Sequence, residues 1–420
     1  PDKVSYYKDA IALAKKHEVP IVLDPVGCHA GAYRLSVVLD LIKTGDISLV
    51  RGNQSEIKAI YDALSPNNQA DTCTTGKGVD GGQIEDSAVI AYRLARVINC
   101  PVVATGEEDY VSDGTRVFAV PHGHPIMTAV TGTGCLLGAV LAAFFSAYYP
   151  CKDSMSIGEF LAYALAYYGL AGEIAVKTSG IKPGSFSVAF MDALYTLDDT
   201  GLMSKNRIRP IVVPDQLQVY FVCGTQDTGL NKKRLLQIVE EACRGGVTCF
   251  QFREKGDGTL EGQQKLELAQ RLQQICAKYH VLYIINDDVE LAVAVNADGV
   301  HVGQDDMRLE DVRNIVGHKV VGISIHSIEE LRKTDVLYAD CVGVGPMYTT
   351  SSKPDAQEPC GPERTTELQA EGLTLPCVGI GGITLDNAMA VLRAGACGVA
   401  VISAIAHAEK PYEAARQFKE

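Results

Sequence analysis

The chain has 420 residues, a length that favours two domains over one hydrophobic core. With 47% hydrophobic residues, 40 glycines and 21% charged residues, its composition is typical of a globular α/β protein and excludes a disordered or fibrous one. The formal net charge of −13 argues against nucleic-acid and anionic-membrane partners. An anionic small-molecule substrate would therefore need a locally positive site.

The thirteen cysteines are scattered, with no C-x-x-C pair and no spacing of a zinc site or disulfide scaffold. Reduced thiols fit this pattern, so we expect a cytoplasmic protein. The sequence has no uninterrupted apolar run of about 20 residues, the length that a membrane span requires.

In the first half, an expected amphipathic helix at 1–20 is followed by apolar runs that end in glycine or polar residues. These runs are "VPIVLDPVG" (19–27), "ISLVRGN" (47–53) and "CPVVATG" (100–106). Long apolar helices are expected at 135–149 and 156–176. Alternation of strands and helices predicts a doubly wound α/β domain over 1–206.

A polar stretch with Pro210 and Pro214 predicts a linker at 207–216. Beyond it, the second domain (217–420) contains eight short apolar runs, most of them separated by helical patterns. The runs lie at 219–223, 247–252, 281–285, 299–302, 320–324, 341–345, 376–380 and 398–402. Eight strands with intervening helices predict a (β/α)8 TIM barrel with its site at the carboxyl ends of the strands.

Polar side chains follow three neighbouring barrel strands. In "QFREK", Gln251, Arg253 and Lys255 alternate and face one side, as in a pyrophosphate clamp. The alternative is a solvated strand exit. "INDD" and "HVGQDD" place Asp287 and Asp306 at adjacent strand ends, where carboxylates can hold Mg²⁺ on a diphosphate. Each aspartate alone is equally compatible with a helix cap.

The later strand ends carry a second anion-binding pattern. The seventh and eighth strands lead into "GIGGIT" and "ISAI", and the sixth is followed by "GPMYTTSSKPD". Glycine amides and helix starts in such loops form the usual phosphate cradle of these barrels. A phosphosugar isomerase barrel would share this cradle but leaves "QFREK" and the aspartates unexplained.

Together these motifs, in order over 217–420, resemble the thiamine-phosphate synthase family, which joins hydroxymethylpyrimidine diphosphate to a thiazole phosphate. The resemblance implies that Mg²⁺ is held by Asp287 and Asp306. It implies a pyrimidine-diphosphate site of Gln251, Arg253, Lys255, Asn286, Ser324 and Lys353. It implies a thiazole-phosphate site of Thr350, Ser351, Ser352, Gly382, Ile402 and Ser403, with Ser352 where the family has threonine.

In the first half, "TAVTGTGC" enters the expected helix near Cys135. Backbone amides at a helix start form an anion hole, and the positive helix end stabilises a thiolate. A small buried cysteine is the alternative. With "IVLDPVG", "RGNQSEI", "VVATGEED" and "KPGSF", this half resembles the hydroxyethylthiazole kinase family, a ribokinase-like fold. The resemblance implies ATP contacts at Arg51, Asn53, Thr105 and Gly106, a thiazole-alcohol contact at Gly132, and catalytic roles for Cys135, Asp24 and Glu56.

These resemblances imply that the first half makes the thiazole phosphate that the second half consumes. The alternative keeps the barrel as the enzyme and makes 1–206 a scaffold or oligomerisation module. Since Asp24 follows what would be a middle strand, we expect that the amino-terminal part of the kinase domain is missing from this sequence. The kinase resemblance also implies a homo-oligomer.

Overall fold

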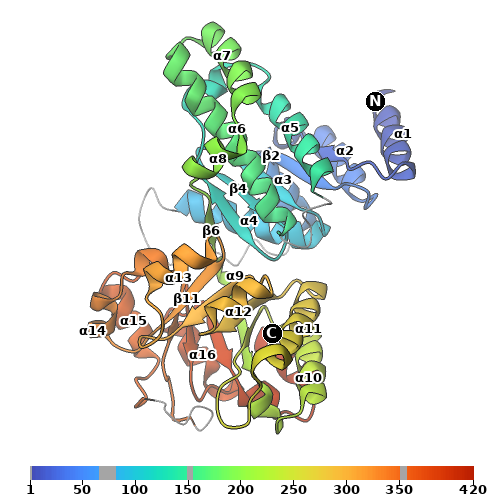
Figure 1. Cartoon of the computed structure of the whole chain (residues 1–420). Helices are drawn as coiled ribbons and strands as arrows, with labels where there is room; N and C mark the ends of the chain where they lie inside the picture. Colours follow the sequence, from blue (N-terminus) through green and yellow to red (C-terminus); the bar gives the residue numbers. More distant parts are fainter. Residues whose placement is uncertain (1, 66–81, 149–154, 351–356) are drawn as a thin grey trace. The chain divides into compact units, whose positions relative to one another are not determined.

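The computed structural model describes residues 2–65, 82–148, 155–350 and 357–420 (Figure 1). The chain divides into two compact units, Pro1–Ile211 and Val212–Glu420. Among the described residues, no helix is long and apolar enough to cross a membrane.

The first unit is built on a six-stranded sheet whose strands lie side by side in chain order. Strands β1 to β3 run parallel, and β3 to β6 run antiparallel. The strands are β1 (Val22–Leu23), β2 (Leu49–Asn53), β3 (Val102–Thr105), β4 (Asp109–Ser112), β5 (Val117–Val120) and β6 (Arg209–Ile211). The three expected strands are confirmed, and the antiparallel strands β4 to β6 are additions that the sequence pattern did not reveal.

Helices cover both faces of this sheet, as a doubly wound fold requires. Adjacent β3 residues face opposite ways: Val102 packs with α2, α3 and α4, whereas Val103 packs with α5, α6 and α7. The helices are α1 (Asp2–Lys16), α2 (Ala32–Ile42), α3 (Gln54–Leu64), α4 (Gly82–Ile98), α5 (Thr133–Ala147), α6 (Ile157–Ser179), α7 (Pro183–Thr196) and α8 (Asp199–Lys205). The predicted doubly wound domain is therefore confirmed.

Residues 207–216, predicted as a linker, contain regular structure. Strand β6 pairs with β5 through Pro210 and Phe118, and helix α9 (Pro214–Leu217) follows directly. Proline is tolerated in β6 because this strand forms the sheet edge. The two prolines thus mark an edge strand and a helix start rather than an unstructured connection.

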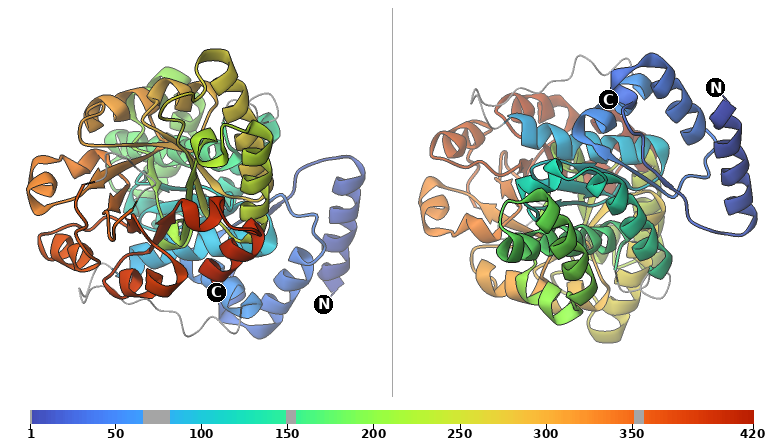
Figure 2. Two further views of the ribbon diagram at one scale, coloured as in Figure 1. Left: turned by 90° about the horizontal axis from the view of Figure 1, so that it is seen from below. Right: turned by 90° about the horizontal axis from the view of Figure 1, so that it is seen from above.

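The second unit is a closed barrel of eight parallel strands inside a ring of helices (Figure 2). The strands are β7 (Val219–Cys223), β8 (Cys249–Phe252), β9 (Leu282–Asn286), β10 (Gly299–Val302), β11 (Val320–Ile325), β12 (Cys341–Val344), β13 (Cys377–Ile380) and β14 (Gly398–Val401). The helices are α10 (Lys232–Gly245), α11 (Gly262–Lys278), α12 (Val289–Ala294), α13 (Leu309–Val316), α14 (Ile328–Lys333), α15 (Glu363–Ala370), α16 (Leu385–Arg393), α17 (Ser403–Ala406) and α18 (Pro411–Lys419). The predicted TIM barrel is confirmed.

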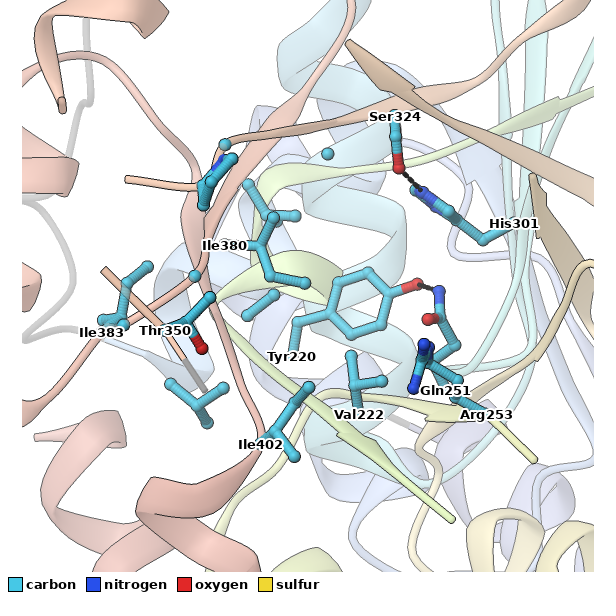
Figure 3. Close-up of a pocket in the computed structure, with 18 of the residues that line it drawn as sticks. Tyr220, Val222, Gln251, Arg253, His301, Ser324, Thr350, Ile380, Ile383 and Ile402 are labelled. Atoms are coloured by element: carbon cyan, nitrogen blue, oxygen red, sulfur yellow. Dashed lines mark hydrogen bonds between the residues drawn. The ribbon is translucent and has the colours of Figure 1, made fainter. Parts of the chain in front are cut away.

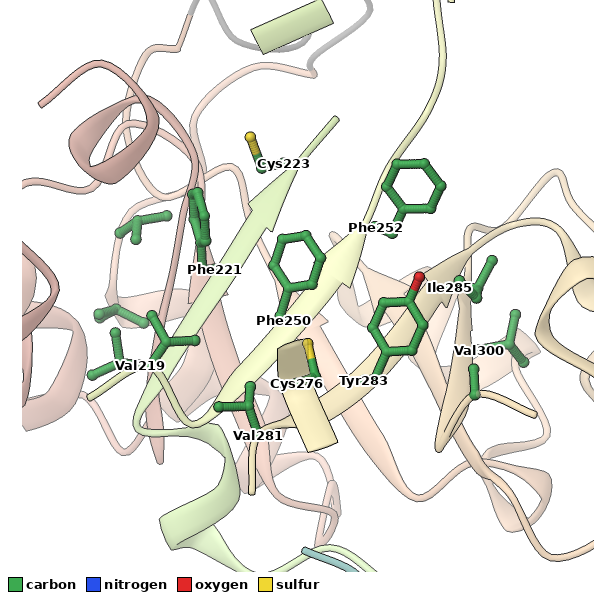
Figure 4. Close-up of a cluster of buried hydrophobic side chains, with 14 of the residues drawn as sticks. Val219, Phe221, Cys223, Phe250, Phe252, Cys276, Val281, Tyr283, Ile285 and Val300 are labelled. Carbon is green, nitrogen blue, oxygen red and sulfur yellow. The ribbon is translucent and has the colours of Figure 1, made fainter. Parts of the chain in front are cut away.

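Side chains alternate between the two faces of each barrel strand. Phe221, Phe250 and Tyr283 belong to the buried layer between strands and helices, where Cys276 of α11 joins them (Figure 4). Their neighbours in sequence, such as Tyr220 and Cys249, belong to a separate cluster in the interior. This alternation aims every second residue of a strand into the barrel.

Candidate active sites

A pocket in the barrel collects side chains from most of the strands (Figure 3). Eight residues that the sequence predicted for substrate binding line it: Gln251, Arg253, Asn286, Ser324, Thr350, Gly382, Ile402 and Ser403. They come from the carboxyl ends of strands or from the loops that follow them. The barrel therefore brings the residues of both predicted substrate sites to one cavity.

Two hydrogen-bonded pairs form one side of this pocket. The Gln251 amide donates from Nε2 to the Tyr220 hydroxyl at 2.9 Å, and the Ser324 hydroxyl lies 2.9 Å from Nε2 of His301. Both partners, Tyr220 and His301, also line the pocket and were not predicted. Each lies inside an apolar run, at a position whose side chain alternates into the barrel. That alternation was the signal in the sequence that could have identified them.

His326 is a further pocket residue. The structure places its Nδ1 atom 2.9 Å from Oε2 of Glu330, one helical turn along. Glu330 also accepts from the His326 backbone amide, so the carboxylate fixes the imidazole at the rim of the cavity.

Lys255, Asp287 and Asp306 form a charged group beside the pocket rather than lining it. The Lys255 ammonium donates to Oδ2 of Asp287 at 2.9 Å. Burial raises the pKa of Asp287, and the neighbouring Asp306 raises it further, whereas Lys255 lowers it. Asp306 accepts from the Gly303 amide at 2.7 Å. The two carboxylates are therefore close enough to repel each other.

This repulsion fits a divalent cation. A positive ion between the carboxylates would offset the charge of Asp306 that raises the pKa of Asp287, and Mg²⁺ takes few protein oxygens when phosphate and water complete its shell. The described residues contain no group of three or more candidate metal ligands. The site thus suits a cation that a bound diphosphate helps to hold, and not an ion held by protein alone.

The loops after β12, β13 and β14 close the opposite side of the pocket. Gly381 and Gly382 have φ values of 97° and 64°, and a Cβ atom on Gly382 would lie 2.5 Å from the Thr349 carbonyl oxygen. The side-chain amide of Asn387 donates a hydrogen bond to the Gly382 carbonyl at 3.0 Å, and this contact holds the turn. Ser351, Ser352 and Lys353, predicted for this region, lie outside the described residues.

In the first unit, Arg51 is the centre of the candidate site. Its guanidinium is buried and donates to Asp24 at 3.1 Å and to Thr105 at 3.3 Å. A Cβ atom on Gly134, at the start of α5, would lie 3.6 Å from two guanidinium nitrogens. Burial raises the pKa of Asp24, and Arg51 lowers it. The structure therefore brings together three predicted residues, Asp24, Arg51 and Thr105, near the predicted anion-binding helix start.

The start of α5 carries the predicted Gly132 and Cys135. Gly132 precedes the helix with φ at 97°, a left-handed conformation that favours glycine. Cys135 is exposed, so the alternative of a small buried cysteine is wrong. Tyr168 of α6 was not predicted; its hydroxyl donates to the Thr133 carbonyl at 2.6 Å and pins the helix start.

Asn53 and Glu56, both predicted site residues, accept hydrogen bonds from backbone amides. Asn53 caps α3 by accepting from the Glu56 amide, and Glu56 accepts from the Asn53 and Gly27 amides at 2.7 Å each. The spacing Asn-x-x-Glu before a helix is a capping box, which the sequence alone displays. Both Glu56 oxygens are therefore engaged in joining the loops that follow β1 and β2.

Gly106 follows Thr105 in the predicted nucleotide loop. Its amide donates to Oδ1 of Asp109 at 2.9 Å. Burial raises the pKa of Asp109 to about 7, although this hydrogen bond lowers it. Asp109 thus anchors the turn that carries two of the predicted ATP contacts.

Folds and sites together define a fusion of two transferase domains that handle phosphorylated substrates. Family models agree: the hydroxyethylthiazole kinase family matches residues 1–200, and thiamine monophosphate synthase matches residues 219–405. The chain belongs to the family of bifunctional thiamine biosynthesis proteins.

Relatives support this assignment over different parts of the chain. The thiamine biosynthesis bifunctional protein ThiM/ThiE of Symbiobacterium thermophilum is 37% identical over 97% of this chain and 82% of its own length. Thiamine-phosphate synthases match the second unit: that of Geobacillus thermodenitrificans is 50% identical over 93% of its length, and that of Bacillus velezensis is 46% identical over 94%. These cover 50% and 51% of this chain, so the bifunctional relative spans both units and the synthases span one.

Proposed function

We propose that the barrel condenses 4-amino-2-methyl-5-hydroxymethylpyrimidine diphosphate with a thiazole phosphate to give thiamine phosphate and pyrophosphate. The observation that carries this proposal is the shared pocket, where polar side chains of β8, β9 and β11 face the loops after β12 to β14. A pocket with two separate anion-binding sides suits a reaction between two phosphorylated substrates.

In this proposal, Arg253 and Asn286 bind the diphosphate from within the pocket, and Lys255 binds it from the charged group at the edge. Gln251 and Ser324 face the pyrimidine ring. The methylene C–O bond breaks, diphosphate departs with the bonding electrons, and the thiazole nitrogen forms the new C–N bond. The electron-rich aminopyrimidine stabilises the cation formed on bond cleavage, so the step requires no general base.

Asp287 and Asp306 would hold Mg²⁺ in this arrangement. Bound there, Mg²⁺ supplies charge neutralisation for the departing diphosphate. On the other side, Thr350, Gly382, Ile402 and Ser403 would cradle the thiazole phosphate. Ser351 and Ser352 would contribute to that cradle, and Lys353 to diphosphate binding, from the segment outside the described residues. Backbone amides in a glycine-rich turn suit a phosphate because they donate without a side chain.

For the first unit, we infer phosphorylation of 4-methyl-5-(2-hydroxyethyl)thiazole by ATP. Arg51 and Thr105 would contact ATP, and Gly132 would lie beside the alcohol. The hydroxyl oxygen attacks the γ-phosphorus, the bond to ADP breaks, and Cys135 takes the hydroxyl proton. The observation that supports this is the convergence of Arg51, Asp24 and Thr105 on the start of α5.

The test is a set of single omissions with the purified chain. Thiamine phosphate is followed by fluorescence after oxidation, in the presence of Mg²⁺, pyrimidine diphosphate and ready-made thiazole phosphate. We expect product that disappears when any one of the three is left out. Product formation without pyrimidine diphosphate, or none with all three, would contradict the synthase proposal.

A further inference from the structure

His301 lies in the barrel interior beneath a residue proposed to bind substrate. It comes from β10, is 9% exposed, and its Nε2 atom is 2.9 Å from the Ser324 hydroxyl of the neighbouring strand β11 (Figure 3). Both side chains line the pocket. A buried imidazole among interior apolar residues requires a polar partner, and the hydroxyl supplies one.

The barrel leaves room for this imidazole on two adjacent strands. A Cβ atom on Gly322 of β11 would lie 2.4 Å from Nδ1 of His301, and one on Gly343 of β12 would lie 3.2 Å from its Cε1. Neither glycine has a positive φ, so neither is required by backbone conformation. The two glycines are therefore explained by the space that the His301 ring occupies.

Ser324 is also held through its backbone. The Gln304 amide, in the loop after β10, donates to the Ser324 carbonyl at 2.7 Å. This contact fixes the position of the serine but leaves its hydroxyl free to rotate about the Cβ–Oγ bond. His301 is the described partner that orients the hydroxyl.

We propose that His301 is a positioning and specificity residue that makes the pocket select an aminopyrimidine over an oxopyrimidine. In this proposal the His301 ring carries its proton on Nδ1, so Nε2 accepts a hydrogen bond from the Ser324 hydroxyl and the serine lone pairs face the cavity. Lone pairs accept a hydrogen bond from an exocyclic amine and repel a carbonyl oxygen. This inference rests on the proposed synthase function and adds how its ring is recognised.

The test compares the 4-amino pyrimidine diphosphate with its 4-oxo analogue. For His301→Leu we expect KM for the amino substrate to rise about 10-fold or more, since the half-buried Ser324 hydroxyl loses its hydrogen-bond partner. We expect the preference for the amino over the oxo substrate to fall by a similar factor. KM for the thiazole phosphate and inhibition by inorganic pyrophosphate should stay unchanged.

Three further variants separate positioning from mere support of the fold. His301→Gln presents an amide oxygen to the serine and should recover most of the preference. Ser324→Ala should lower the preference as His301→Leu does, and the His301→Gln, Ser324→Ala double variant should lose no more than Ser324→Ala alone. His407→Leu, which removes an exposed imidazole that does not line the pocket, is a control that should keep the amino preference. Should His301→Leu fail to fold, His301→Gln, Ser324→Ala and the double variant carry the test.

The proposal is overturned if the amino preference survives in His301→Leu and Ser324→Ala. It is also overturned if KM rises by the same factor for the amino and the oxo pyrimidine diphosphates. Failure of the proposed function itself has a different result: wild-type protein would form no product from either pyrimidine diphosphate. The two failures are therefore distinguishable in one set of assays.

Discussion

The two candidate sites are built in different ways. In the barrel, residues two apart, such as Gln251 and Arg253, reach one pocket because alternate side chains face the interior. In the first unit, contacts converge on Arg51, which reaches Asp24 and Thr105 across 27 and 54 residues of sequence. The barrel site takes its side chains from many strand ends, whereas the site in the first unit is built around the buried guanidinium of Arg51. The comparison predicts that single substitutions affect one reaction and spare the other.

The largest effect is expected for Asp306→Asn. The amide can still accept from the Gly303 amide, so the loop is kept while the charge beside Asp287 is lost. We expect synthesis from ready-made thiazole phosphate to fall by at least about 100-fold, since even residues one shell removed from a metal cost 10–100-fold. ADP release by the first unit should be unchanged. Synthesis within about threefold of wild type would remove Asp306 from the proposed cation site.

Arg51→Lys tests the central cation of the other site. Lysine keeps the charge but cannot reach Asp24 and Thr105 together, because it lacks the planar fork. We expect ATP-dependent phosphorylation of the thiazole alcohol to fall by about 100-fold, as for loss of preorganised electrostatic contacts. Synthesis from ready-made thiazole phosphate in the same preparation is the control. Nearly full kinase activity would show that Arg51 supports the fold alone.

Arg253→Ala should weaken diphosphate binding more than turnover. Loss of a charged hydrogen-bonding partner predicts a rise of roughly 10- to 100-fold in KM for pyrimidine diphosphate. Steady-state kinetics measure this, with Arg332→Ala as the control because Arg332 is exposed and pairs with Glu371. An unchanged KM would mean that Arg253 does not contact the diphosphate.

The smallest effect is expected for Tyr168→Phe in the first unit. The change removes the 2.6 Å hydrogen bond that pins the Thr133 carbonyl, worth about 1 kcal/mol, so kinase activity should fall roughly fivefold. Tyr195→Phe, which alters a hydroxyl on a 91% exposed residue of α7, should have no effect. Equal rates for both variants would show that the helix start needs no such anchor.

Much of the barrel could be predicted because each buried run ends in polar residues at a strand end. His301 and Tyr220 escaped prediction because their partners, Ser324 and Gln251, lie 23 and 31 residues away, and only strand register brings them together. For Lys255, the alternation of side chains predicted a place beside Arg253. In the structure it lies at the edge of the pocket, because its ammonium pairs with Asp287.

In the first unit, the prediction was limited at a hairpin and at a helix cap. The antiparallel half of the sheet was missed, although Asp113 and Gly114, in the short connection between β4 and β5, are a hairpin signal in the sequence. Glu56 was assigned to catalysis although its capping-box spacing with Asn53 was readable. The hydrogen bonds show that Glu56 joins two backbone amides, and its catalytic role stays a prediction.

The central claim is that one chain carries two separate sites, the first making what the second consumes. The most direct measurement mixes the Arg51→Lys and Asp306→Asn proteins with the thiazole alcohol, ATP, Mg²⁺ and pyrimidine diphosphate, and follows thiamine phosphate. We predict that each protein alone makes almost no product and that the mixture restores synthesis through released thiazole phosphate. A mixture as inactive as its components, with the wild-type chain active under the same conditions, would contradict the account.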